Sequence, residues 1–222
     1  MAAGKIDRQS RKFTALMMLL LGAVAVAAWG RARMTDKISY AEHLDDRAVT
    51  VDGTDYTFRD LAVYLAYQEQ EISEQAKIYD LEQPEKYWNA HTNGQFIRVA
   101  GKNGAMDRAV HDVIFCEMAK QEGTVLSDAE KAFTENQKLD FWNDLEEEGQ
   151  ERLSVSREEI DVLFERIALA QKQQQLYADE QGVDLREYNV NGSLYTELLK
   201  EHTYKINEKL WKRLNFGKIT IE

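Results

Sequence analysis

Residues 105–133, AMDRAVHDVIFCEMAKQEGTVLSDAEKAF, contain the signals that decide the expected fold. Apolar side chains recur at helical spacing as far as Ala119. Gly123 follows at a position where a glycine commonly ends a helix in the left-handed conformation. Ser127 and Glu130 then have the spacing of a capping box, which starts a new helix. The stretch therefore predicts two successive helices joined by a short turn.

Helical signals continue on both sides of this stretch. Thr57 can cap a helix whose apolar stripe runs from position 61 to position 79. Ser156 and Glu159 form a second capping box, for a helix expected to end near Gly182. A last helix is expected over 193–214. With a single proline in the chain, we predict a mainly α fold.

Two short segments alternate like strands. Residues 48–53 (AVTVDG) end in an Asp-Gly turn, and residues 218–222 (KITIE) form the C-terminus. Because an unpaired strand edge needs a partner, we expect these two strands to pair and close the helical domain. The glycines at positions 94, 101 and 104 predict that the stretch containing them is less regular.

An apolar run at 13–30, FTALMMLLLGAVAVAAWG, follows a basic leader at 1–12. A spanning helix needs roughly 20 mainly apolar residues, so the run predicts a transmembrane anchor; a cleaved secretory signal is the alternative interpretation. We therefore expect a cytoplasmic leader, the anchor or signal segment, a juxtamembrane linker at 31–47 and an extracytoplasmic helical domain at 48–222. The expected location is the cell membrane, in single-pass topology.

The charge is strongly acidic. Lys and Arg number 28 and Asp and Glu 39, which gives a net charge of −11. Residues 1–33 hold six Lys or Arg and one Asp, so residues 34–222 carry −16. Nucleic-acid and anionic-lipid surfaces call for a clustered basic face, so we expect no nucleic-acid partner. Cys116 is the only cysteine, which excludes an intramolecular disulfide, and its apolar neighbours predict that it is buried.

Signals for enzymatic chemistry are missing from the sequence. The histidines at positions 43, 91, 111 and 202 have no metal-ligand spacing. The chain has no GxSxG, GxGxxG or GxxxxGK[ST] motif, so a nucleophile elbow and a phosphate loop are not indicated. We expect no catalytic residues, no metal and no cofactor.

Large apolar side chains are the remaining candidates for function, because aromatic and methionine side chains suit adaptable peptide contacts. The alternative is that helical spacing places some of them in the core. The predicted peptide-binding residues are Tyr87, Trp88, Phe96, Ile97, Phe115 and Met118.

The helix, glycine turn and capped helix of 105–133 resemble the N-terminal chaperone module of SurA-type and PrsA-type extracytoplasmic folding factors, which is also similar to the C-terminal part of trigger factor. Val51-Asp52-Gly53 and the helix from Ser156 resemble other parts of that module, and the resemblance covers about 49–172.

This resemblance implies a chaperone-like domain that binds unfolded, secreted or emerging polypeptides. Relatives usually add a parvulin-type prolyl isomerase domain, for which the chain leaves no room, so we expect no isomerase activity. The alternative is a scaffold or adaptor for one membrane or cell-envelope partner protein.

Overall fold

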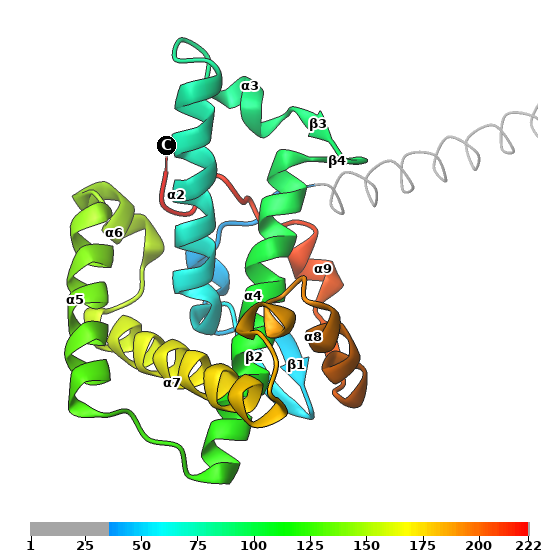
Figure 1. The fold of residues 1–222 in the computed structure, drawn as a ribbon. Helices are drawn as coiled ribbons and strands as arrows, with labels where there is room; N and C mark the ends of the chain where they lie inside the picture. The colour runs from blue at the N-terminus through cyan, green and yellow to red at the C-terminus, as the bar shows by residue number, and fades with distance from the viewer. Residues whose placement is uncertain (1–35, 222) are drawn as a thin grey trace, which may run out of the picture. The chain divides into compact units, whose positions relative to one another are not determined.

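The core is built on three long helices. In the computed structural model, which describes residues 36–221, α2 (Ala62–Tyr79) and α4 (Ile97–Glu122) pack side by side and α7 (Arg157–Gln181) crosses them (Figure 1). The helix α5 (Asp128–Asp144) packs on α7, and α6 (Glu147–Leu153) connects the two.

Both predicted capping boxes are confirmed. The Ser127 hydroxyl accepts a hydrogen bond from the Glu130 backbone N–H, and the Glu130 carboxylate accepts one from the Ser127 N–H at 2.6 Å. Ser156 and Glu159 make the same reciprocal pair at the start of α7. Each box satisfies backbone donors that the first helical turn leaves unpaired, so local sequence sets where these helices begin.

A small antiparallel sheet lies beside the helices, in the order β2 (Thr54–Thr57), β1 (Arg47–Val51), β5 (Tyr204–Ile206). Asp52 and Gly53 form the turn between β1 and β2 with φ angles of 45° and 83°, as a two-residue hairpin requires. The predicted pairing of the 48–53 strand with 218–222 is wrong. β1 pairs with β2 and β5, and residues 218–221 form no strand.

The predicted helix over 193–214 is also wrong. The segment divides into α8 (Ser193–Leu198), η4 (Leu199–Glu201), β5 and α9 (Glu208–Trp211). Asp52 helps to hold the break: its carboxylate accepts the Thr203 backbone N–H at 2.7 Å and lies 2.6 Å from His202 Nδ1. These contacts, together with the pairing of β5 and β1, override the helical periodicity of the segment.

The glycine-containing stretch after Pro84 is ordered. It contains α3 (Glu85–Trp88) and a two-stranded hairpin, β3 (His91–Thr92) and β4 (Gln95–Phe96), before α4 begins. Gly101 and Gly104 lie inside α4, so the prediction of an irregular stretch there is wrong. A Cβ at Gly101 would clash with Cδ1 of Ile72 on α2, which explains why a glycine occupies this buried helical position.

The C-terminal tail passes over α2 instead of pairing with β1, and Figure 1 shows its last described residues, in red, beside that helix. Glu69 on α2, a fully buried carboxylate, accepts hydrogen bonds from the backbone N–H groups of Gly217, Ile219 and Thr220. Short 3-10 turns complete the described chain: η1 (Ala41–His43), η2 (Arg59–Leu61) and η3 (Leu185–Tyr188).

The predicted fold class and membrane location need correction. Among residues 36–221, no helix is both long enough and apolar enough to cross a bilayer. The predicted segment 13–30 lies outside the described residues. What the structure describes is a mainly helical chain with a small sheet, and the closing pair of terminal strands is replaced by the β2-β1-β5 sheet.

Candidate functional site

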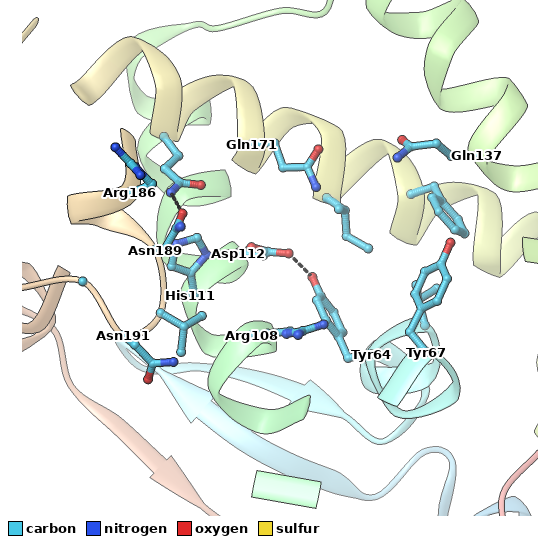
Figure 2. A pocket seen from close by; sticks show the side chains of 16 residues that line it. Tyr64, Tyr67, Arg108, His111, Asp112, Gln137, Gln171, Arg186, Asn189 and Asn191 are labelled. Atoms are coloured by element: carbon cyan, nitrogen blue, oxygen red, sulfur yellow. Dashed lines mark hydrogen bonds and ion pairs between the residues drawn. The ribbon is translucent and has the colours of Figure 1, made fainter. Parts of the chain in front are cut away.

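A cavity of about 660 Å³ lies between α2, α4, α7 and the loop after η3, and we call it the central cavity (Figure 2). This volume falls in the range of roughly 300–1,000 Å³ that small-ligand sites occupy. The side chains that line it are mostly polar or aromatic. They are Val63, Tyr64, Tyr67, Arg108, His111, Asp112, Gln137, Phe164, Ile167, Gln171, Gln174, Arg186, Asn189, Val190, Asn191 and Gly192.

A hydrogen-bonded chain of three side chains forms one wall. The Tyr64 hydroxyl donates to Asp112 Oδ2 at 3.0 Å, and Asp112 Oδ1 lies 2.8 Å from His111 Nδ1. His111 Nε2 lies 2.9 Å from the Tyr188 backbone carbonyl. The chain therefore joins α2, α4 and η3. Burial, reinforced by the nearby Asp112 carboxylate, raises the pKa of Tyr64 well above its usual value, so Tyr64 acts as a donor.

The hydrogen-bonded side chains Tyr64, Asp112 and His111 hold one another in place, and none of them is left as a free base. Both His111 nitrogens lie within hydrogen-bond distance of an oxygen atom, Nδ1 of Asp112 Oδ1 and Nε2 of the Tyr188 carbonyl, so neither is directed to a ligand. Both Asp112 oxygens are engaged as well. The geometry suits a rigid wall for a ligand better than proton abstraction, which needs a base with an available lone pair.

Carboxamide side chains form much of the remaining wall. Gln174 Nε2 donates to Asn189 Oδ1 at 3.0 Å, which fastens the loop after η3 to α7. Within residues 36–221, the side chains of Gln137, Gln171 and Asn191 make no such bond. Each carboxamide offers two N–H donors and an acceptor oxygen, so these groups are available to a ligand that carries amides or hydroxyls.

A second hollow of about 370 Å³ lies between α5 and α7, and we call it the side hollow. Its apolar lining includes Leu126, Ala129, Phe133 and Ala168. Gln137 and Gln171 line the central cavity as well, so the two hollows adjoin. The central cavity therefore offers polar groups, and the adjoining side hollow offers apolar surface.

Four of the six residues predicted for peptide binding lie around α3 and the β3–β4 hairpin. Trp88 is only 6% exposed and packs against the Phe216 ring with centroids 5.8 Å apart, so it belongs to the core. Tyr87 is half-buried and its hydroxyl donates to Gln75 at 2.8 Å. Phe96 is 51% exposed, and Ile97 is half-buried at the start of α4.

The other two lie far along α4. Phe115 is fully buried in an aromatic cluster with His111 and Tyr195, and Met118 packs partly buried against the core. At 1.5 Å per residue, Phe115 is roughly 27 Å along the helix from Ile97. The structure does not bring the six residues together in one groove.

The sequence contains signals for the central cavity that composition and motif searches overlook. Arg108, His111 and Asp112 share one face of α4 because they are three and four residues apart. Gln171 and Gln174 are spaced in the same way on α7. Polar residues at helical spacing beside an apolar stripe mark a half-buried polar face, but only packing shows which faces meet.

Metal and thiol sites find no support in the structure. Within the described chain, no group of three or more His, Cys, Asp or Glu side chains is placed to hold a metal ion. Cys116 is buried, which confirms that prediction, and burial raises the pKa of its thiol. A raised pKa reduces the thiolate fraction and hence the reactivity of a cysteine.

Comparisons with protein-family models, with curated proteins and with solved structures find no match.

Proposed function

We propose that this protein binds extended or unfolded polypeptide non-covalently, in the central cavity and the adjoining side hollow, without prolyl isomerase activity. One observation carries the proposal: uncommitted carboxamides and apolar side chains line two hollows that share Gln137 and Gln171.

The chemistry of a polypeptide matches this lining. An extended chain presents a backbone N–H and C=O at every residue, and each needs a partner when it leaves water. The carboxamides of Gln171 and Asn191 can supply both kinds of partner. The rings of Tyr67 and Phe133, which are 37% and 62% exposed, offer contact area to apolar side chains. Such contacts are tolerant of sequence because they depend on area and not on one hydrogen-bond pattern.

A bulky substitution at Gln171, which lines both hollows, tests the proposal. Gln171 is exposed on α7, so Gln171→Trp fills the junction of the two hollows without disturbing the core. Gln175→Trp is the matched control, because Gln175 is exposed one turn further along α7 and lines neither hollow. Fluorescence anisotropy of the full-length chain with two unrelated unfolded polypeptides measures the effect.

We expect Gln171→Trp to weaken binding of both polypeptides by about tenfold or more, which corresponds to 1.4 kcal/mol, while Gln175→Trp leaves it near the wild-type value. Equal affinities for the two variants would overturn the assignment of the site. Failure of the wild type to bind either polypeptide, together with co-purification of one saturable partner, would favour an adaptor that recognises a single protein. Refolding of a proline-limited substrate should proceed at its uncatalysed rate.

A further inference from the structure

Two arginines line the central cavity of this strongly acidic chain. They are Arg108 from α4 and Arg186 from η3, and Figure 2 shows them at separate positions around the opening. Among the described residues that line it, Asp112 is the only one with an acidic side chain. With His111 counted as neutral, the lining side chains sum to +1, and the carboxylates of Glu71 and Asp184 lie next to the two arginines outside the lining.

The acidic group in the lining is already engaged. Asp112 accepts the Tyr64 hydroxyl at 3.0 Å on one oxygen and lies 2.8 Å from His111 Nδ1 on the other. Its oxygens are therefore not directed to a ligand.

Arg108 is the cation that is best placed to bind a ligand. Its guanidinium lies 3.9 Å from Glu71 Oε2, beyond hydrogen-bond distance, and half of each side chain is exposed. Arg186, in contrast, is held by Asp184 at 2.7 and 3.0 Å. A guanidinium presents parallel N–H donors that match the two oxygens of a carboxylate, and such charge-assisted pairs are stronger than neutral hydrogen bonds.

We propose that the central cavity recognises a carboxylate of the bound polypeptide, with Arg108 as the cation that pairs with it. This inference rests on the polypeptide-binding function proposed above. The carboxylate comes from the chain terminus or from an Asp or Glu side chain, because both present the same two oxygens. The carboxamides of Gln171 and Asn191 then bind the adjacent backbone.

Four peptides of one apolar and aromatic sequence provide the test, with the full-length protein and fluorescence anisotropy. The first has a free C-terminal carboxylate, the second is amidated, and the third and fourth are amidated with one internal Asp or Asn. Each is measured with wild type, Arg108→Gln and Arg47→Gln. Arg47 is the matched control because it also lies 3.9 Å from a carboxylate, that of Asp55, is 44% exposed and lies on β1 away from the cavity.

We expect the peptides with a carboxylate to bind wild type about tenfold more tightly than the neutral ones. Arg108→Gln removes that difference, Arg47→Gln keeps it, and added salt reduces it. A difference for the first peptide alone identifies the chain terminus as the source, and one for the third alone identifies an acidic side chain.

The experiment distinguishes failure of the carboxylate inference from failure of the proposed polypeptide-binding function. If all four peptides bind wild type equally well, the carboxylate inference is wrong while polypeptide binding stands. If none binds, the proposed function fails and this inference fails with it. A carboxylate preference that survives Arg108→Gln would overturn the role of Arg108.

Discussion

The Glu69 carboxylate accepts both the backbone N–H and the hydroxyl of Thr220, at 2.7 and 2.9 Å from Oε2. These residues are 151 positions apart, and the contact fixes the C-terminal tail to the middle of α2. Gly217 and Ile219 donate their backbone N–H groups to the same carboxylate. Burial raises the pKa of Glu69 because desolvation disfavours the charged form, and the donors of the tail oppose that cost.

Glu69→Gln should destabilise the fold by about 1–3 kcal/mol, the cost of leaving a buried polar group unsatisfied. The amide nitrogen of Gln presents N–H donors to the N–H groups of the tail, so at least one buried donor loses its acceptor. Urea unfolding measures the change. Glu74→Gln is the control, since Glu74 is exposed on the same helix. Equal unfolding free energies for the two variants would contradict the role assigned to Glu69.

Gly101 and Gly104 should respond in opposite ways to alanine, although both lie inside α4. Gly104→Ala should stabilise the protein by up to about 1 kcal/mol, because alanine has the higher helix propensity and its Cβ would lie 3.4 Å from the flexible end of Gln68. Gly101→Ala should destabilise it by about 1–3 kcal/mol, because the Cβ enters the space of the buried Ile72 side chain. Thermal unfolding of the two variants decides the matter, and a stabilised Gly101→Ala protein would show that α2 and α4 can separate without cost.

Trp88→Ala should lower stability by about 3–5 kcal/mol, the cost of removing a large buried ring. The ring packs on Phe216, and a Cβ at Gly217 would lie 3.1 Å from it, so the loss also loosens the tail. Phe96→Ala should change stability by only about 0.5 kcal/mol, because Phe96 is 51% exposed. Denaturant titration distinguishes the two, and a Trp88→Ala protein as stable as Phe96→Ala would contradict the core assignment.

Glu130 predicts a pH dependence of stability. Hydrogen bonds from Lys172 and Ser127 lower its pKa from 4.5 to about 2. Since the folded state has the lower pKa, its contribution is fully present above about pH 4.5 and is lost as the pH falls towards 2. The difference in urea midpoint between wild type and Glu130→Gln should therefore shrink over that interval.

A double-mutant cycle with Lys172→Gln isolates the Glu130–Lys172 pair, whose atoms lie 2.7 Å apart between α5 and α7. Its coupling should be present at neutral pH and largely lost near pH 2, where about half of the Glu130 carboxylates are protonated in the folded state. A coupling energy that does not vary with pH would show that the Glu130–Lys172 pair does not cause the pH dependence of stability.

Local signals predicted two of the four expected helix starts and predicted chain pairing poorly. The N-caps expected at Thr57 and Ser193 are wrong, because α2 and α8 begin after Leu61 and Gly192 with no side-chain cap. The capping boxes at Ser127 and Ser156 succeeded because every atom involved lies within four residues. The predicted strand at 218–222 failed because alternation also suits a tail that turns its N–H groups onto Glu69. For the site, the sequence indicated aromatic and methionine side chains, but Phe115 and Trp88 are buried in the core.

By itself the sequence determined where the two helices with capping boxes start, that glycines at positions 123 and 182 end α4 and α7, and that the charge is acidic, because these properties depend on neighbours along the chain. Only the tertiary structure decided which polar helix faces meet around the central cavity, how the segment after Ser193 divides, and where the tail goes. Those outcomes depend on contacts such as Asp52 with Thr203 and Glu69 with Thr220, whose partners are about 150 residues apart. The free energy of a buried hydrogen bond depends on which groups packing brings together and removes from water, and no local pattern encodes it.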